Sequence, residues 1–395
     1  MKTTPLGNLA TVMTGGTPER GTPAYWGGSI PWVGTGEIDF NVIESPTEYL
    51  TERGLKESAA RLLPKGTLLM AMYGQGTTRG KVGILAIEAA TNQACAAIIP
   101  KEGLIESEFL FYVLEATYTR IRRLSNTGSQ ENLNSTLIRE IPVPVLPKAA
   151  RDEIVSAAKE WNAAIEKATA LLTALEQRKQ GLMQQLLTGR RRLKGFKPKW
   201  KMTRADKLFD DVAKRSQLNE QLLSVTQDRG VIPRTMLVGR VTMPSGDVNS
   251  FKLVEPDNFV ISLRSFQGGL EHSAYRGLVS PAYTVLEADT AQIHAPYFRQ
   301  YFKSDDFLHR LSVAVVGIRD GKQISFTDFK SIKLPLPPLP EQEAIARLLN
   351  FVDSEIALAV QRVELLRTQK RALMQKLLSG NWRMRKAALL KEFSA

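Results

Sequence analysis

Residues 175–189 read LEQRKQGLMQQLLTG, and residues 366–380, which lie 191 positions later, read LRTQKRALMQKLLSG. Eight of the fifteen aligned positions are identical. Continuing the alignment upstream without a gap places Ile154 on Ile345. Self-similarity at a fixed period indicates repeated structural units. The chain is therefore a tandem duplication with a period near half its length of 395 residues.

Each copy carries apolar residues that recur by alternating threes and fours over more than four heptads, which is typical of a coiled coil. The predicted seam consists of Ile154, Trp161, Ile165, Leu172, Leu175, Leu182, Leu186, Ile345, Val352, Ile356, Val363, Leu366, Leu373 and Leu377. Lys179 and Lys370 interrupt the two seams at the same place, and a polar seam residue disfavours slipped pairings. The alternative, two unrelated amphipathic helices on separate cores, does not explain the shared phase.

The flanks of the two helices agree with each other. A proline-rich strap precedes each helix, Ile141–Pro147 and Ile332–Pro340, and we expect each strap to be extended and unpaired, because proline lacks an amide donor. Each helix is expected to stop at a glycine, Gly189 or Gly380. The short linker after Gly189 requires the helices to run antiparallel, with the globular parts at opposite ends of a rod of roughly 50 Å.

The remaining sequence is globular. Short apolar runs between Gly and Thr turns predict strands, and one helix-like stretch lies near the end of each part, so both parts are expected to be α+β. We expect a first globular domain with its strap at 1–147, a first helix at 148–189, a basic linker at 190–202, a second domain with its strap at 203–340, a second helix at 341–380 and a basic tail at 381–395.

Composition limits the possible classes of protein. Apolar residues make up 43% and charged residues 24%, which excludes disorder over most of the chain. The formal net charge of +13 favours a polyanionic partner. Cys95 is the single cysteine, which excludes an intramolecular disulfide. The absence of a long apolar run or a secretory signal predicts a cytoplasmic protein with no membrane contact.

Motifs for catalysis are incomplete. Trp32–Gly36 (WVGTG) matches an adenosylmethionine-binding loop only superficially, and its glycines read as turn residues. Gln75–Val82 (QGTTRGKV) lacks the first glycine and the hydroxyl of a phosphate-binding loop. His272, His294 and His309 have no metal-ligand spacing. We therefore expect a chain without catalytic residues and without a metal site.

Several motifs, in this order along the chain, resemble the DNA specificity subunit of type I restriction–modification systems. In the first half they are Ile30–Val33 followed by Glu37–Asp39, Gly66–Met70, Gly80–Ile84, Thr91–Cys95 and Ile141–Pro144. In the second half they are Gly277–Tyr283 and the run LPLPPLPEQE at 334–343, which leads directly into the second helix. The first helix departs from this pattern, because Pro147–Arg151 (PKAAR) lacks the Glu-Gln pair, which predicts two non-identical partner-binding surfaces.

The resemblance implies a non-catalytic subunit for sequence-specific DNA binding in a complex for DNA methylation and phage defence. Each globular domain would be a target-recognition domain that reads one half of a bipartite, asymmetric sequence in double-stranded DNA. The helices would set the spacing and dock two methyltransferase subunits, and restriction subunits could join. Adenosylmethionine, ATP and magnesium would be bound by the partner subunits and not by this chain. A stand-alone coiled-coil assembly protein with protein- or glycan-binding heads is the alternative.

Polar and basic residues in predicted loops are the candidates for DNA contact, and each of them could equally be a solvated turn residue. They are Tyr73, Gln75, Thr77, Thr78, Arg79, Lys81, Ser129, Gln130 and Asn132 in the first domain, and Arg264, Gln267, His272, Arg276, Arg319, Lys322 and Gln323 in the second. The run of Arg and Lys from Arg190 to Lys201 is the densest positive segment, for which phosphate contact and plain solvation of a linker remain equally open.

Overall fold

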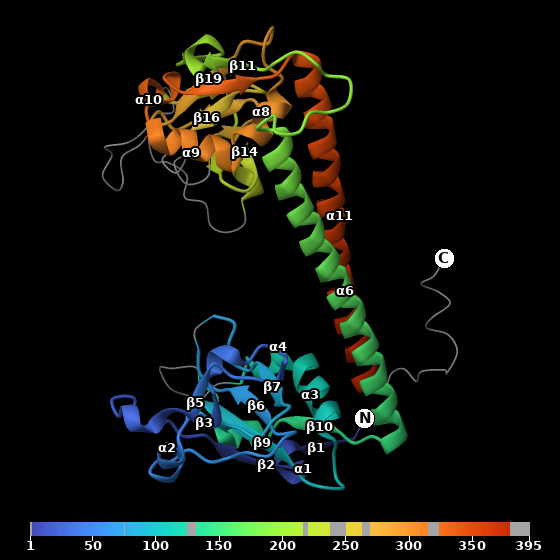
Figure 1. Ribbon diagram of the computed structural model, residues 1–395. Helices are drawn as coiled ribbons and strands as arrows, with labels where there is room; N and C mark the ends of the chain where they lie inside the picture. The colour runs from blue at the N-terminus through green and yellow to red at the C-terminus, as the bar shows by residue number, and fades with distance from the viewer. Residues whose placement is uncertain are drawn as a thin grey trace. The chain divides into compact units, whose positions relative to one another are not determined.

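The chain divides into two compact units in the computed structural model (Figure 1). Unit 1 comprises Met1–Ala168 and Arg362–Ala395, and unit 2 comprises Thr169–Gln361. The long helices α6 (Lys148–Leu186) and α11 (Leu339–Leu378) each contribute one part to each unit. The structure describes residues 2–74, 76–124, 132–215, 220–237, 250–262, 269–314 and 324–379.

Unit 1 is built on a five-stranded sheet in the order β2-β9-β6-β7-β4 and a three-stranded sheet in the order β5-β3-β8. Its strands are β1 (Thr3–Pro5), β2 (Ala10–Thr14), β3 (Trp26–Val33), β4 (Val42–Ile43), β5 (Glu48–Leu50), β6 (Leu68–Ala71), β7 (Val82–Leu85), β8 (Ala90–Thr91), β9 (Cys95–Pro100) and β10 (Pro142–Pro144). Its short helices are α1 (Leu6–Leu9), α2 (Glu52–Lys56), α3 (Ser107–Ala116), α4 (Tyr118–Ile121) and α5 (Ser135–Arg139).

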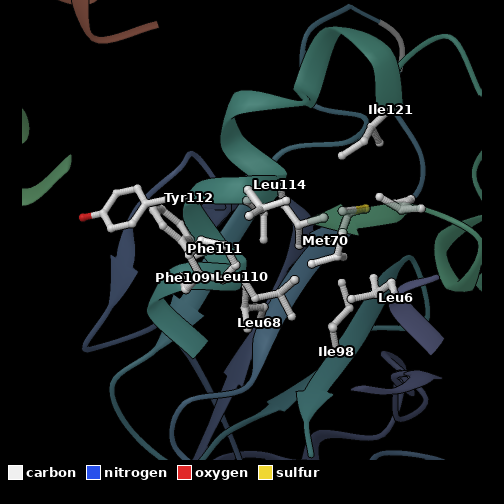
Figure 2. Close-up of a cluster of buried hydrophobic side chains, with 14 of the residues drawn as sticks. Leu6, Leu68, Met70, Ile98, Phe109, Leu110, Phe111, Tyr112, Leu114 and Ile121 are labelled. Carbon is white, nitrogen blue, oxygen red and sulfur yellow. The ribbon is translucent and has the colours of Figure 1, made fainter. Parts of the chain in front are cut away.

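Both faces of the five-stranded sheet are buried, which explains the unbroken apolar run of β6. Leu68 and Met70 lie on the face that packs against α3, as Figure 2 shows. Leu69 and Ala71 alternate with them and belong to a second cluster on the other face. Strands that are covered on both sides need apolar residues at every position rather than at alternate ones. The core of unit 1 therefore fixes where the loops at the ends of β6 and β7 emerge.

Unit 2 is built on a four-stranded sheet in the order β12-β19-β16-β17. Its strands are β11 (Lys201–Arg204), β12 (Phe209–Val212), β13 (Leu223–Thr226), β14 (Gly230–Pro233), β15 (Lys252–Val254), β16 (Phe259–Ile261), β17 (Glu271–His272), β18 (Gly277–Val279), β19 (Thr284–Ala288) and β20 (Lys333–Leu336), and its short helices are α8 (Ala295–Tyr301), α9 (Asp305–Ala314) and α10 (Phe326–Lys330). Phe209 lies at the centre of an aromatic core, within 5.5–5.8 Å of the rings of Phe259, Phe298, Phe302 and Phe329. The two globular parts are α+β, as predicted, and each has its own core.

The proline straps are extended, but the prediction that they stay unpaired was wrong. In unit 1, β10 pairs antiparallel with β1, and in unit 2, β20 pairs antiparallel with β11. A strand that contains proline can form an edge ladder, because the residues between the prolines still donate their amides. The pairing ties the first strand of each globular part to the segment that leads into the following long helix.

The two long helices run antiparallel within each unit. In unit 1, the start of α6, with Ile154 and Ala158, shares a core with Leu373 and Leu377 near the end of α11. In unit 2, the end of α6 shares a core with the start of α11 in the same way. All fourteen predicted seam residues are buried or half-buried. The predicted fold class, two α+β parts with an intramolecular antiparallel pair of long helices, is confirmed.

The observed ends of the two long helices lie within three residues of the predicted ones. Helix α6 ends at Leu186, and Gly189 follows with a φ of +71°, a conformation that favours glycine at a helix end. Helix α11 begins at Leu339, within the proline-rich strap. The predicted stop at Gly380 and the predicted tail at 381–395 lie outside the described residues.

The Glu-Gln pair at the start of α11 is an internal joint, and the expected difference between the two partner-binding surfaces stays a prediction. Glu341 and Gln342 are fully buried. The Gln342 side-chain amide donates to the Pro337 carbonyl at 2.9 Å. At the equivalent position of the first copy, Arg151 donates to the Leu146 carbonyl at 2.9 Å. Arg151 therefore makes the same bond to the strap in the first copy that Gln342 makes in the second.

Candidate nucleic-acid interface

A glycine-rich loop connects β6 to β7 in unit 1. Gly74, Gly76 and Gly80 have φ values of +129°, +88° and +84°, a region that residues with a Cβ rarely adopt. A Cβ on Gly80 would lie 3.2 Å from a methyl carbon of Ile121, so α4 packs directly against this end of the loop. The backbone of the loop is therefore shaped by its glycines and by the helix beside it.

Side chains of α4 and the following turn hold this loop. The Tyr118 hydroxyl donates to the Thr77 carbonyl, and the Arg122 guanidinium donates to the Gly76 carbonyl. Arg79 returns the contact by donating to the Arg122 carbonyl at 2.9 Å. We call Tyr118 and Arg122 the loop clamp. A loop held in one conformation loses little further conformational entropy when it binds a ligand.

The structure separates the candidates predicted in the first domain. Tyr73 and Thr77 are exposed at the loop surface, whereas Thr78 and Asn132 are half-buried. Arg79 is only 7% exposed, so its prediction as a DNA-reading residue is wrong: its side chain supports the loop from inside. Lys81 is half-buried and forms an ion pair with Asp39. The remaining candidates, Gln75, Ser129 and Gln130, lie outside the described residues.

The sequence analysis missed the clamp and the cations beside it. Arg120 and Arg123 are exposed next to the clamp residue Arg122. The signal that could have found them is the run Arg120-Ile-Arg122-Arg123 at the end of a predicted helix. Exposed arginines beside a preorganised loop form a surface suited to a nucleic-acid backbone.

In unit 2, the two described candidates near β17 are both paired with carboxylates of the same unit. His272 is half-buried, with 11% of its side chain exposed; it bonds Asp257 at 2.8 Å and packs on the Phe259 ring. Burial lowers its pKa, and the bond to Asp257 opposes this effect. Arg276 is exposed, but Glu220 at 2.9 Å and Glu255 neutralise it. The other candidates, Arg264, Gln267, Arg319, Lys322 and Gln323, lie outside the described residues.

A buried ion pair supports the β13–β14 hairpin of unit 2. Lys303 binds the Glu271 carboxylate and donates to the Gln227 carbonyl in the hairpin turn at 3.2 Å. Burial raises the pKa of Glu271 to about 7, although Lys303 favours its charged form. The other carboxylate oxygen of Glu271 is buried without a hydrogen-bond partner in the described part of the chain. The hairpin therefore rests on a carboxyl group that titrates near neutral pH.

The described residues were predicted to include no metal site, and two observations concern the groups involved. Among them, no group of three or more His, Cys, Asp or Glu side chains could hold a metal ion. Cys95 is buried, and this burial raises the pKa of its thiol to about 12, which leaves it protonated at neutral pH. None of the helices in the described ranges is long and apolar enough to cross a bilayer.

Comparison with known proteins gives concordant results. The type I restriction modification DNA specificity domain matches residues 1–177 and 282–367. The MjaIX type I restriction enzyme specificity subunit of Methanocaldococcus jannaschii is 28% identical over 167 residues, which are 40% of this chain and 37% of that protein. The putative MjaX specificity subunit of the same organism is 23% identical over 307 residues, 72% of this chain and 70% of that protein.

Two solved structures share the fold over nearly the whole chain. The S subunit of a type I restriction–modification system from M. genitalium superposes with a TM-score of 0.53 at 14% identity, covering 97% of this chain and 96% of its own. A chain solved in work on complex assembly and conformational transition of the type I R-M system gives a TM-score of 0.63 at 16% identity, covering 96% and 98%.

Two of the curated relatives are matched over little more than a third of their own length. The match to MjaIX spans little more than a third of that relative, and the match to the Escherichia coli EcoR124I/EcoR124II specificity subunit spans 35% of it at 25% identity. The family match is broader, because it reaches into both copies of the duplication and covers about two thirds of the chain. With its duplicated helices, proline straps and paired α+β parts, this chain belongs to the type I restriction modification DNA specificity domain family.

Proposed function

We propose that this chain is the DNA-recognition subunit of a type I restriction–modification complex and that each globular part reads one half of a bipartite, asymmetric target. One observation carries the proposal: the family match reaches into both copies of an internal duplication whose helices are alike and whose globular parts differ. Two different reading parts on two similar helices suit a target with two different halves.

Each globular part has its own loop surface, which supports the proposal that each part reads one half of the target. The first part offers Tyr73 and Thr77 on the clamped loop, with Arg120 and Arg123 beside it. The second part offers the β13–β14 hairpin, which Lys303 supports from below. Polar loop side chains contact bases, while arginines fix the register on phosphates.

The proposed activity also requires partner subunits that carry out the chemical steps. Two methyltransferase subunits would dock on the helices, and restriction subunits could join them. On α11, Phe351 and Leu358 are 60% and 66% exposed, an apolar surface of the kind that partner helices cover. Adenosylmethionine, ATP and magnesium would belong to the partners, and this chain would perform no chemical step. The alternative of protein- or glycan-binding heads has no comparable support, because the family match is to a DNA specificity domain.

Mapping methylated adenines in the host genome, with and without this gene, tests the proposal. Deletion should remove methylation from one bipartite, non-palindromic motif, and re-expression should restore it. Exchanging the first globular part for that of a relative should change one half of the motif only. Unchanged methylation after deletion, or loss of a continuous palindrome, would contradict the proposal.

A further inference from the structure

The basic segment between α6 and β11 is a folded loop. We call residues 190–201 the basic loop. It leaves the end of α6, passes the start of α11 and returns to β11 (Figure 1). Inside unit 2, the Arg192 guanidinium binds the fully buried Glu341 carboxylate, and the Trp200 indole donates to the same carboxylate at 2.9 Å. The Arg192 guanidinium also lies over the Trp200 ring, 5.4 Å from its centre.

These contacts fix the direction of the side chains along the loop. Arg192 donates to the Pro198 carbonyl at 2.9 Å, which ties the two arms of the loop together. Leu193 and Trp200 pack against the core of unit 2 and are half-buried, as is Phe196. The apolar and aromatic residues of the loop therefore point inward. The exposed side chains that remain are charged, apart from Pro198.

That surface is positive and without counter-charge. Arg191, Lys194, Lys197, Lys199 and Lys201 are exposed, and within the described ranges none of them forms an ion pair. The sequence from Gln177 to Ala205 contains no Asp or Glu. The Glu341 carboxylate is buried and already bound by Arg192 and Trp200, so it does not neutralise this surface. Arg190 is left out of this surface, because it shares a cavity with Asp305 and Asp306 at the start of α9.

The composition of this surface favours phosphate groups over a protein as its ligand. Protein interfaces bury aromatic and apolar residues at their centre, and here those residues face inward. Lysine ammonium groups are compact point charges that suit phosphate oxygens and carry no base preference. A solvated linker would not require a buried carboxylate and a tryptophan to hold it.

We propose that the basic loop is a phosphate-binding surface that contacts the backbone of double-stranded DNA independently of base sequence. The proposal rests on the proposed function of the chain as a DNA-recognition subunit and adds a second kind of DNA contact. The reading loops would supply sequence preference, and the basic loop would supply affinity that depends on salt. Its contribution would be equal on target and non-target DNA.

The test is a variant that removes three of these charges, with Lys194→Gln, Lys197→Gln and Lys199→Gln combined in the full chain. Its affinity for a duplex that lacks the target is measured by fluorescence anisotropy over about 50–200 mM salt. Each lost phosphate contact should reduce the slope of log affinity against log salt by about 0.9, so the slope should fall by up to about 2.7. Affinity at the lowest salt concentration should fall roughly tenfold or more. Target and non-target duplexes should lose affinity by the same factor.

The matched control replaces the same three lysines by arginine, which keeps the charge and should keep both slope and affinity. Thermal unfolding of both variants should match the parent chain, because the three side chains are exposed. An unchanged slope in the glutamine variant would overturn the phosphate-binding surface while leaving DNA recognition intact. Weaker capture of a methyltransferase subunit with an unchanged DNA slope would overturn it in favour of an acidic protein partner. If the parent chain, alone and with its methyltransferase, did not bind duplex DNA, the proposed function itself would fail.

Discussion

Lys179 and Lys370 occupy the same position in the two copies of the long helix, yet they bind carboxylates from different parts of their units. In unit 2, Lys179 on α6 binds Asp353 on α11 at 2.6 Å. In unit 1, Lys370 on α11 is 8% exposed and binds Glu115 on α3 at 2.6 Å. Both copies of the long helix thus carry a lysine at this position. Its carboxylate partner lies on the other long helix in unit 2 and on α3 of the globular part in unit 1.

In the first copy, the position equivalent to Asp353 carries an uncharged residue. It is Asn162, whose side-chain amide donates to the Tyr112 hydroxyl of α3 at 3.4 Å. In unit 2, Gln300 of α8 donates to Asp353 at 2.6 Å. Lys179 binds across the two long helices, so its interpretation as a register device between them stays a prediction, whereas that interpretation is wrong for Lys370, which binds α3 instead. Lys370 fastens the globular part of unit 1 to α11.

The largest difference between the units should come from the joint at the start of α11. We expect Glu341→Ala to destabilise unit 2 by about 3–5 kcal/mol, because it removes one partner of a buried ion pair and the acceptor of the Trp200 indole. Ala150 is the equivalent residue in unit 1, and Ala150→Ser should change stability by less than about 0.5 kcal/mol. Hydrogen exchange read separately for the two units, with urea unfolding, measures both. Equal effects would show that the joints are interchangeable.

The next comparison tests whether the shared part of the helices is equivalent in energy. Ile154 and Ile345 are aligned by the duplication and are 4% and 0% exposed. Each should cost about 2–5 kcal/mol when replaced by alanine, with the loss confined to its own unit. Phe351→Ala is the control, because that side chain is exposed and should have little effect. A loss that spread equally to both units would mean that they unfold as one.

A pH dependence should distinguish unit 2 from unit 1. The pKa of Glu271 in the folded chain is about 7, above the ordinary value of 4.5, because the carboxyl is buried. The folded state therefore holds this proton more tightly than the unfolded state, and stability falls as pH rises from about 4.5 through about 7. The loss should reach up to about 3 kcal/mol.

Glu271→Gln tests this assignment, since an amide does not titrate. Urea unfolding of unit 2 at several pH values should lose the downward trend in the variant. His272 works in the opposite direction, because its lowered pKa makes unit 2 lose stability as pH falls below about 6.5. A trend that survived in Glu271→Gln would assign the pH dependence to another group.

The ion pairs of Lys370 and Lys179 should contribute less to stability, and the two contributions should differ in size. A double-mutant cycle on Lys370 and Glu115 should give a coupling energy of about 1–3 kcal/mol, because the ammonium is nearly buried. The same cycle on Lys179 and Asp353 should give about 0.2–1 kcal/mol, because both side chains are more accessible to water. Alanine replacements and urea unfolding supply the values. Equal coupling energies would contradict the expected difference between the Lys370 pair and the Lys179 pair.

The smallest expected effect concerns the loop clamp. Tyr118→Phe removes the hydroxyl that donates to the Thr77 carbonyl and keeps the ring that packs edge-on against Phe40. Affinity for the half-site read by the first part should fall by about 1 kcal/mol, roughly fivefold, while the other half-site is unaffected. Anisotropy with duplexes that carry either half-site measures this, and the melting temperature should stay the same. Equal loss on both half-sites would contradict the assignment of one part to one half.

The sequence predicted the periodic and repeated features because these depend on neighbouring residues. Strands such as β6 and β9 and the seam from Ile154 to Leu186 follow from local apolar patterns. The candidate site was predicted less well, because a loop position says little about exposure. Arg79 was predicted to face DNA and lies inside, while Tyr118 and Arg122, which hold the loop, carried no local signal of that role.

The duplication, the two long helices, the α+β character of both parts and the family can all be predicted from the order of the amino acids. Which charges are paired inside the protein and which remain on its surface depends on how the chain packs. Glu115 meets Lys370 across 255 positions, and Arg192 meets Glu341 across 149. Such pairs depend on how separately folded segments pack, and burial then sets whether a charge is neutralised internally or remains available to a partner.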